Sequence, residues 1–346
     1  MEKPLKIRLH IVSPIHIGCD DVYEPTSFVI DEKKNKLIEF DPMDFIKSLS
    51  PRDRQEFTKI CMEGSISSIV KMYDFISRRQ VKGREIEIAT ELIAHYKKVK
   101  GLSTNVESKV RQELNQFTIN RTTYNPHNNL PYIPGSSIKG AMRTAYLSML
   151  AKDQNVADCW EKYLQRNESA TEQDKYHFIG KKQVAKKLEK DLLQGEFKTD
   201  PFRMVRPSDF LPVGDVKTKI VYAVNKKKNV SNLNRGEERG NIPQILEVIR
   251  EESIFEGTIH IQQPEPTAGI KKPIQSKELL NSMHDFYKKI VNEEDDITNS
   301  LGAGHIVVNS IINKFKDKRG ISAFLIRIGR HSGAESMTIE GNRCIK

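Results

Sequence analysis

The chain has 346 residues and a mass of 39.7 kDa, which exceeds the usual size of a single hydrophobic core, so we expect about two domains. The mean hydropathy is −0.55, and no apolar run approaches the ~20 residues that a membrane span needs, which excludes a membrane role. The N-terminus has no signal-peptide pattern, so we expect a soluble, cytoplasmic protein. The 56 Lys and Arg residues against 46 Asp and Glu give a net charge of +10, which favours a polyanion, RNA or DNA, as the partner.

The first elements that the pattern predicts are strands. Apolar residues alternate with polar ones over residues 5–11, as in a half-buried strand, and residues 15–18 continue the alternation briefly. Two short apolar runs at 27–30 and 36–40 enclose the polar loop 31–35, which predicts a β-hairpin. We therefore expect a sheet to begin close to the N-terminus.

A helical period follows the hairpin. Asp41-Pro42 and Ser50-Pro51 each combine an N-cap residue with a proline at the first helical position, so they predict two short helices in succession. We interpret residues 41–79 as a helical insertion within the first domain.

The middle of the chain carries helix signals and then strand signals. Residues 85–116 mix both patterns and receive no assignment. A helix is expected to begin near residue 135, and a polar helix is expected over 156–193. Strand signals return at 216–224 and 254–261, where apolar and β-branched residues alternate with charged or polar ones.

A long polar connection and further regular elements complete the chain. Residues 225–243 are polar and rich in Asn and Gly, and a connection of this length is expected to be functional or mobile. Helices are expected at 276–292 and 303–318, followed by a strand at 324–328.

The order of strands, helices, strands, helices and a final strand predicts an α+β protein of two units rather than a doubly wound sheet. We place the first unit at residues 1–195 and the second at 196–346, with 225–243 as a basic loop. The candidate residues for binding a polyanion in this loop are Lys226, Lys227 and Lys228.

The most informative motif spans residues 133–145, where an extended Pro-Gly entry gives way to a helix with one apolar stripe. Gly135 permits unusual backbone angles, and Ser136 or Ser137 is a natural N-cap. The N–H groups at the positive end of the helix dipole would favour a bound anion.

Lys139 and Arg143 add positive charge to this motif. They lie four residues apart, so they share a side of the helix and could both contact a phosphate. An ordinary capped helix with solvated basic side chains explains the same spacing, so the motif by itself does not establish a binding site.

A second motif lies near the C-terminus, where the expected strand runs into a basic turn with glycines at 329 and 333. These glycines would let the backbone approach a ligand closely, and the neighbouring side chains supply hydrogen-bond donors. A tight hairpin turn is the plain alternative. The candidate residues in this motif are Arg327, Arg330, His331, Ser332 and Gly333.

The third motif is the segment 13–18, Ser-Pro-Ile-His-Ile-Gly, which offers His16 and Gly18 as candidate binding residues. It is unremarkable by itself. In their order and spacing, however, the three motifs together resemble the RAMP superfamily of CRISPR-associated proteins. The motifs are short, but they span nearly the whole length of the chain.

This resemblance implies a ferredoxin-like, RRM-like fold, usually in two units, with a glycine-rich turn near the C-terminus. It also implies a non-catalytic, RNA-binding subunit of a type III-A CRISPR (Csm) ribonucleoprotein, which holds the 3′-end side of the CRISPR RNA and supports its maturation and complex assembly. A neighbouring RAMP backbone subunit and other Csm subunits would be the partners. The expected strand at 5–11 has no aromatic residue, so holding of the RNA backbone fits better than base stacking.

Catalysis is the main alternative, because some RAMP relatives cut RNA without a metal through a histidine. His16 and His331 are the candidates, although neither has an evident acid-base partner in the sequence. An adaptor that does not contact RNA is the third possibility. We expect no metal and no cofactor, because the four cysteines are far apart and no P-loop or zinc-binding motif is present.

Overall fold

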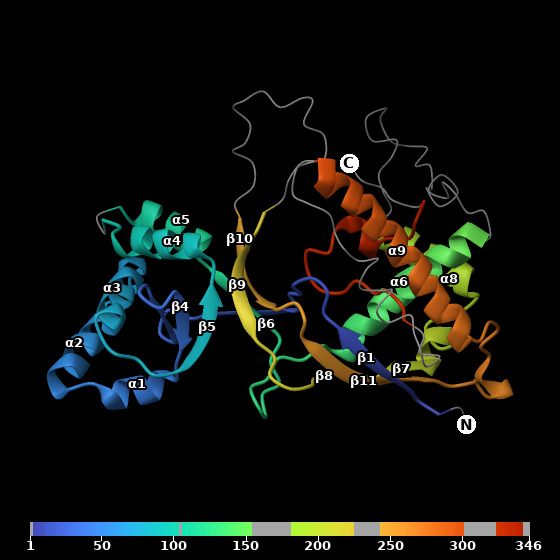
Figure 1. The fold of residues 1–346 in the computed structure, drawn as a ribbon, viewed down its shortest axis with the longest axis horizontal. Helices are drawn as coiled ribbons and strands as arrows, with labels where there is room; N and C mark the ends of the chain where they lie inside the picture. Colours follow the sequence, from blue (N-terminus) through green and yellow to red (C-terminus); the bar gives the residue numbers. More distant parts are fainter. Residues whose placement is uncertain (1–2, 104–105, 154–180, 225–242, 301–322, 342–346) are drawn as a thin grey trace, which may run out of the picture. The chain divides into compact units, whose positions relative to one another are not determined.

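A computed structural model describes residues 3–103, 106–153, 181–224, 243–300 and 323–341 of the chain (Figure 1). Contacts divide the protein into two units, each built from segments far apart in the sequence. Unit 1 comprises Met1–Val12, Tyr132–Pro212 and Ile254–Lys346, and unit 2 comprises Ser13–Pro131 and Val213–Ser253.

The two units do not follow the linear division expected from the sequence. The expected boundary near residue 195 falls inside the second segment of unit 1. The N-terminal strand pairs along its whole length with a strand in the last third of the chain, from Leu5 opposite Ile259 to His10 opposite Ile254, which ties the start of the chain to its C-terminal part. Division of the chain into folding domains at residue 195 stays a prediction.

Unit 1 contains a small antiparallel sheet in the order β1-β11-β7, with β8 also paired to β11. Its strands are β1 (Leu5–His10), β7 (Val205–Pro207), β8 (Leu211–Pro212) and β11 (Ile254–Ile261). Its helices are α6 (Gly135–Asp153), α8 (Lys181–Leu193) and α9 (Ser276–Ser300), with the short 3-10 helices η1 (Pro201–Met204), η3 (Pro266–Ala268) and η4 (Ala334–Met337).

The sheet of unit 1 has an apolar face and a polar face because its side chains alternate. The inward side chains of β11 that are fully buried are Phe255, Ile259 and Ile261. Lys6, Arg8 and His10 of β1 are exposed. Helices α6 and α9 lie side by side in this unit (Figure 1), and the Tyr287 hydroxyl donates to the Ala141 carbonyl at 3.1 Å.

Unit 2 contains a seven-stranded sheet in the order β2-β6-β10-β9-β5-β4-β3. Its strands are β2 (Gly18–Val22), β3 (Phe28–Asp31), β4 (Lys36–Glu39), β5 (Arg84–Ile88), β6 (Ile119–Thr122), β9 (Thr218–Ala223) and β10 (Gln244–Ile249). Its helices are α1 (Pro42–Ser48), α2 (Pro51–Met62), α3 (Ile66–Ser77), α4 (Thr90–Lys100) and α5 (Glu107–Gln116).

Helix α3 joins two apolar cores in unit 2. Its Tyr73 belongs to the core under α4 and α5, where the Tyr73 ring centroid lies 5.5 Å from that of Phe28 and 5.6 Å from that of Tyr96. Phe75 and its neighbours on the other side of α3 pack with α1 and α2. The helical insertion therefore encloses a core of its own against the β3–β4 hairpin.

Most of the locally encoded elements are confirmed. The strand at the N-terminus, the hairpin of β3 and β4, and the strand at 254–261 lie where the alternation predicted them. Asp41 and Ser50 are the N-caps of α1 and α2. The unassigned stretch 85–116 forms β5, α4 and α5, and α9 extends the helix expected at 276–292 as far as Ser300. The mixed α+β class is confirmed, with two sheets.

One prediction in the C-terminal third differs from the structure, and one strand was missed. The strand expected at 324–328 is wrong, because residues 323–328 have no regular secondary structure. Strand β10 was not expected. The helix expected at 303–318, the first part of the one expected at 156–193, and nearly all of the basic loop 225–243 lie outside the described residues. Within the part of the chain that the structure describes, no helix is long and apolar enough to span a membrane.

Candidate nucleic-acid interface

The start of α6 is fixed by close packing against the segment between β7 and β8. Ile133 forms an isolated antiparallel bridge with Phe210, with N–H to carbonyl distances of 3.0 and 2.8 Å. A Cβ atom on Gly135 would lie 2.6 Å from the Pro207 carbonyl oxygen and 2.7 Å from that of Ser208. The glycine is therefore required by this close approach of two backbones, not by a left-handed conformation.

The expected serine N-cap of α6 is wrong. The helix begins at Gly135, so Ser136 and Ser137 lie in its first turn. The Gly135 N–H donates to Oδ1 of Asp209 at 2.8 Å, and the Ser137 N–H donates to the Pro134 carbonyl at 3.0 Å. The Asp209 carboxylate therefore accepts a hydrogen bond from one of the N–H groups that we expected to bind an anion.

Arg143 connects three elements of unit 1. Its Nε and Nη2 atoms lie 3.0 and 2.7 Å from Oε2 of Glu189 on α8, and its Nη1 lies 2.8 Å from Oδ2 of Asp200 before η1. The guanidinium carbon also lies 5.2 Å from the ring centroid of Phe202. Because two carboxylates already hold this side chain, the expected phosphate contact would compete with two ion pairs.

Lys139 lies one turn before Arg143 and is half-buried. Burial lowers its pKa below the ordinary value, while the negative charge of Asp200 acts in the opposite direction. Three positive charges lower this pKa further, and they belong to Arg143, Arg206 and Arg203. The arginines are therefore near enough to Lys139 for their charges to be felt.

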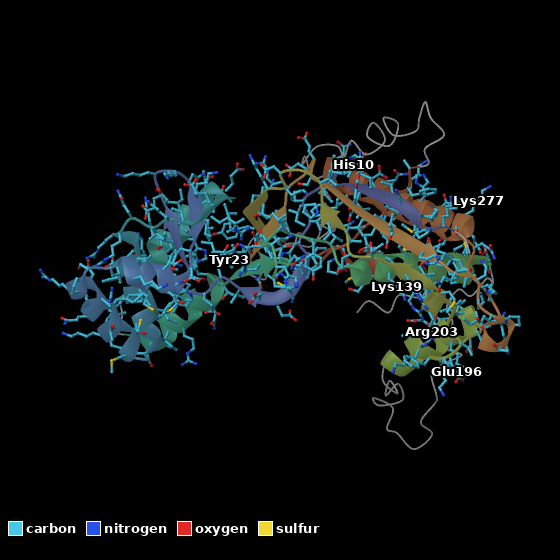
Figure 2. The ribbon with its side chains drawn as sticks, turned by 90° about the horizontal axis from the view of Figure 1, so that it is seen from below. His10, Tyr23, Lys139, Glu196, Arg203 and Lys277 are labelled. Atoms are coloured by element: carbon cyan, nitrogen blue, oxygen red, sulfur yellow. The ribbon has the colours of Figure 1, made fainter. Side chains whose placement is uncertain are left out.

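We call Lys139, Arg143, Arg203 and Arg206 the basic cluster. Arg203 belongs to η1 and Arg206 to β7, and both side chains are exposed. Figure 2 shows Lys139 and Arg203 in the same part of unit 1. Neither exposed arginine was predicted from the sequence, because their placement beside Lys139 depends on the packing of β7 on α6 and of η1 on β7.

Within the basic cluster, Arg143 is paired with Glu189 and Asp200, and the charge of Asp200 also acts on Lys139. The cluster has four cations against these two carboxylates, so positive charge is in excess. A cationic excess formed by residues from three elements is the kind of surface that binds phosphate groups.

The glycine-rich turn is confirmed as a turn with left-handed backbone angles. The φ angles are +100° at Gly329, +65° at His331 and +84° at Gly333. The Ser336 hydroxyl donates to the carbonyls of Ser332 and Gly333 at 2.6 and 3.0 Å, which holds the turn closed. The turn is thus a preformed structure and not a flexible end.

The side chains of this turn have different surroundings. Ser332 is buried, whereas Arg330 and His331 are exposed. Partial burial and the charge of Arg330 lower the pKa of His331 below its ordinary value. Arg327 forms an ion pair with Glu294 on α9.

The segment that follows the glycine-rich turn packs away from the start of α6. The segment after the turn contacts the second half of α6, where the Glu340 N–H donates to the Ser148 hydroxyl at 3.1 Å. Ser148 lies nine residues from Lys139 along the helix, or about 13 Å. The segment after the turn and Lys139 therefore belong to different stretches of α6 and its surroundings.

The third motif belongs to unit 2. His16 is only 4% exposed, and its Nδ1 lies 2.8 Å from the Glu247 carbonyl oxygen. Gly18 starts β2, opposite Thr122 of β6. His16 is therefore part of the interior of this unit, and Lys226, Lys227 and Lys228 lie outside the described residues.

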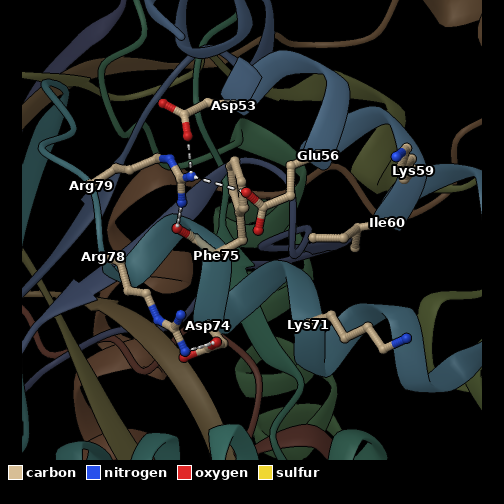
Figure 3. A pocket seen from close by; sticks show the side chains of 9 residues that line it. All are labelled: Asp53, Glu56, Lys59, Ile60, Lys71, Asp74, Phe75, Arg78 and Arg79. Carbon is tan, nitrogen blue, oxygen red and sulfur yellow. Dashed lines mark hydrogen bonds and ion pairs between the residues drawn. The ribbon is translucent and has the colours of Figure 1, made fainter. Parts of the chain in front are cut away.

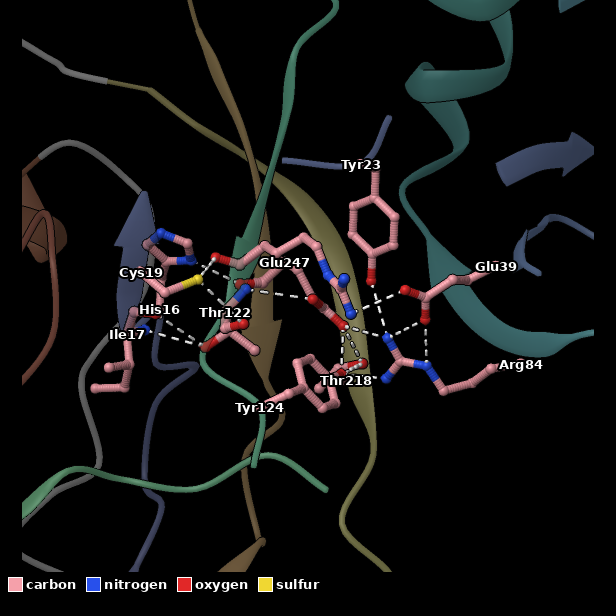
Figure 4. A network of polar contacts seen from close by, with 11 residues as sticks. His16, Ile17, Cys19, Tyr23, Glu39, Arg84, Thr122, Tyr124, Thr218 and Glu247 are labelled. Carbon is pink, nitrogen blue, oxygen red and sulfur yellow. Dashed lines mark hydrogen bonds and ion pairs between the residues drawn. The ribbon is translucent and has the colours of Figure 1, made fainter. Parts of the chain in front are cut away.

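A buried polar network joins strands β4, β5, β6, β9 and β10 of the unit 2 sheet (Figure 4). Glu247 on β10 is 0% exposed. Its Oε1 accepts hydrogen bonds from the Tyr124 hydroxyl at 2.6 Å and the Thr218 hydroxyl at 2.8 Å. The Thr122 N–H approaches its Oε2 at 3.3 Å. Nothing in the sequence indicated that this carboxylate is buried.

Two arginines balance the acids of this network. Arg84 lies 2.7 Å from Glu39 and 3.6 Å from Glu247, and Arg121 lies 2.8 Å from Glu39. Burial raises the pKa of Tyr23, and the charge of Glu247 raises it further. Since two carboxylates face two guanidinium groups, the network has no excess positive charge that could bind RNA. Its role is to connect the strands of the sheet.

A surface hollow of about 640 Å³ lies between α2 and α3 (Figure 3). The charges around it are paired, for example Arg79 with Asp53 at 2.6 Å and Lys71 with Glu63 at 2.7 Å. The hollow therefore lacks the excess of positive charge that the basic cluster has. Among the described residues, no group of three or more His, Cys, Asp or Glu side chains could hold a metal ion.

Known proteins resemble this chain over most of its length. The CRISPR system Cms protein Csm5 of Methanocaldococcus jannaschii is 25% identical over 207 residues, which cover 60% of this chain and 43% of that protein. The chain thus matches less than half of the length of this curated relative.

Two solved structures share the fold. A chain in a cryo-EM structure of a Csm-crRNA-target RNA ternary complex of a type III-A CRISPR-Cas system has a TM-score of 0.62 at 18% identity, over 98% of this chain and 88% of that chain. The crystal structure of T. onnurineus Csm5 has a TM-score of 0.57 at 16% identity, over 93% and 89%. The family model of the RAMP superfamily matches residues 8–327, and the chain therefore belongs to this superfamily.

Proposed function

We propose that the chain is a non-catalytic RNA-binding subunit of a type III-A CRISPR (Csm) ribonucleoprotein. It would hold the sugar-phosphate backbone at the 3′-end side of the CRISPR RNA and support RNA maturation and complex assembly, with a neighbouring RAMP backbone subunit and other Csm subunits as partners. The similarity to Csm5 and to a chain of a Csm complex with RNA supports this role. The ferredoxin-like character of the two units is part of the same proposal.

The basic cluster is the observation that carries the proposal. Lys139, Arg203 and Arg206 come from a helix, a 3-10 helix and a strand, and these elements pack together: β7, which carries Arg206, contacts both α6 and η1, and Lys139 and Arg203 lie in the same part of unit 1 (Figure 2). Bringing like charges together is unfavourable unless anions neutralise them, and an RNA backbone offers negative charge at regular spacing beyond what Glu189 and Asp200 supply.

The polar face of the unit 1 sheet favours contacts with the RNA backbone over recognition of RNA bases. An ordinary RRM stacks bases on aromatic residues of its central strands. Strand β1 instead exposes Lys6, Arg8 and His10, and its partner β11 places Glu256, Thr258 and His260 along the same stretch.

The alternative, a metal-independent ribonuclease, needs an imidazole that can reach a 2′-hydroxyl. His16 is 4% exposed and lies inside unit 2, so its imidazole cannot reach RNA unless this unit opens. His331 is exposed, and its pKa is lowered by partial burial and by Arg330. The ribonuclease alternative therefore depends on His331.

The test is binding of single-stranded RNA by the purified full-length chain. The double variant Lys139→Ala, Arg206→Ala should bind at least about tenfold more weakly, because it removes two phosphate contacts. The matched control is Lys109→Ala, Arg111→Ala, which removes two exposed charges from α5 in unit 2. Equally weakened binding in the two double variants would show that only net charge matters, and would contradict a site at the basic cluster.

A further inference from the structure

Phe197 is the most exposed large apolar side chain in the described part of the chain, with 86% of its surface accessible. It lies in the turn between α8 and η1. Its neighbours in the chain, Glu196 and Lys198, are charged and exposed, so no apolar surface continues from the ring along the chain. An aromatic ring held in water in this way lacks the stabilisation that burial would give, which calls for an explanation.

The turn that carries Phe197 is rigidly built. The Glu196 N–H donates to the Thr199 hydroxyl at 2.9 Å, and the Thr199 N–H donates back to the Glu196 carbonyl at 2.9 Å. A Cβ on Gly195 would lie 2.5 Å from the Thr199 carbonyl oxygen, so the backbone is tightly folded there. The backbone that carries the exposed ring is therefore held by the local structure of this turn.

Phe197 lies directly beside the basic cluster. The guanidinium carbon of Arg203 is 5.6 Å from the ring centroid, and Arg203 Nη1 donates to the Phe197 carbonyl at 3.3 Å. Arg203 in turn lies in the same part of unit 1 as Lys139 (Figure 2). One exposed aromatic face and several cations thus occupy the same end of unit 1.

A nucleotide combines the two groups that such a surface can bind. Its base has a flat π-face that stacks on an aromatic side chain, and its phosphate binds cations. We propose that Phe197 is a stacking platform for one unstacked RNA base whose adjacent phosphate is held by Arg203 and Lys139. This inference rests on the proposed RNA-binding function and adds a base contact to it.

A protein partner is the other class of molecule that an exposed aromatic could contact. Aromatic anchors in protein interfaces are surrounded by a ring of residues that exclude water. The residues around Phe197 are instead Glu196, Lys198 and Arg203, which are exposed and charged. This composition favours a base with its phosphate.

The first experiment measures RNA affinity of the full chain against salt concentration. Phe197→Ala should weaken binding about 5- to 150-fold, as removal of one stacked base does, without changing the salt slope, because no charge is removed. Phe197→Trp should retain the affinity. Met62→Ala is the matched control, since Met62 is 81% exposed in unit 2 and should have no effect.

The second experiment observes the ring itself. The only tryptophan of the chain is Trp160, so Phe197→Trp in a Trp160→Phe background carries one reporter. RNA should quench its fluorescence, and an RNA of the same length made of abasic nucleotides should not, although that RNA keeps its phosphates.

The outcomes separate the two proposals. Unchanged affinity of Phe197→Ala together with weaker binding of Lys139→Ala, Arg206→Ala would overturn the stacking platform and leave RNA binding intact. Loss of a partner subunit with unchanged RNA affinity would assign Phe197 to a protein contact and also overturn it. If the wild-type chain does not bind RNA, both proposals are wrong.

Discussion

Two basic residues one helical turn apart on α6 have different surroundings. Arg143 is held by Glu189 and Asp200, whereas Lys139 is half-buried among arginines. We therefore expect Arg143→Ala to lower the free energy of unfolding by about 1–3 kcal/mol, because it removes hydrogen bonds to charged groups and leaves two carboxylates behind. Lys139→Ala should change this free energy by less than about 0.5 kcal/mol and weaken RNA binding instead. Urea unfolding of both variants tests the difference, and equal destabilisation would contradict it.

Glu247 is a second residue whose surroundings decide its role. Glu247 is buried and accepts hydrogen bonds from Tyr124 and Thr218, so Glu247→Gln should lower the free energy of unfolding by about 1.5–3 kcal/mol, the usual contribution of hydrogen bonds to a charged group. Glu251→Gln is the control, because the Lys219–Glu251 pair is partly exposed and should contribute less than about 1 kcal/mol. Similar destabilisation of the two variants, measured by urea unfolding, would show that the network is not important for stability.

Residue types and spacing identified Lys139 and the turn around Gly333 as notable, but could not identify Arg203, Arg206 or Glu247. The role of each missed residue comes from groups distant in the chain: Glu247 meets Tyr124, which lies 123 residues earlier. Hydrophobic periodicity contains no information on such contacts.

At the scale of elements, the entry into α6 is the most constrained part of the motif. Gly135→Ala should destabilise the protein by about 1–3 kcal/mol, since its Cβ would collide with two backbone carbonyls that cannot easily move. Gly140→Ala is the matched control five residues further on. A Cβ there meets nothing within 4 Å, so alanine should stabilise the helix by up to about 1 kcal/mol. A thermal melt in which both variants behave alike would contradict this explanation of the glycine at the helix start.

Elements with local signals were predicted well, and those with distant partners were not. Strand β1 and the caps Asp41 and Ser50 follow from neighbouring residues. The serine cap of α6 failed because Asp209, 74 residues away, supplies the acceptor for the Gly135 N–H. The strand expected at 324–328 failed because alternation shows which side chains point inward, not whether another strand is available for pairing.

At the scale of the whole molecule, the pairing of β1 with β11 decides the organisation. These strands are separated by more than 240 residues, and no local pattern specifies such a pairing. The resemblance to the RAMP superfamily depended on short motifs, and these lie in two different units: the segment at His16 in unit 2, the α6 start and the glycine-rich turn in unit 1. Family membership was therefore predictable, but the grouping of the motifs was not.

The whole molecule is expected to bind RNA without cutting it. Incubation of a repeat-containing RNA with highly purified chain, with and without divalent metal, should leave the RNA intact on a denaturing gel. His331→Ala should lower affinity modestly, since it removes an exposed donor from the glycine-rich turn. Cleavage by the wild-type chain that disappears in this variant would establish the ribonuclease alternative instead.

The most direct test of the central claim, that the chain holds RNA by its phosphates through the basic cluster, is the salt dependence of RNA affinity. For two unrelated single-stranded sequences, the logarithm of the affinity should fall with the logarithm of the salt concentration along the same line. Lys139→Ala, Arg206→Ala should make this line shallower by about 1.4, or about 0.7 for each phosphate that the protein no longer neutralises. A flat response in the wild-type chain, or a slope that the double variant leaves unchanged, would contradict the claim.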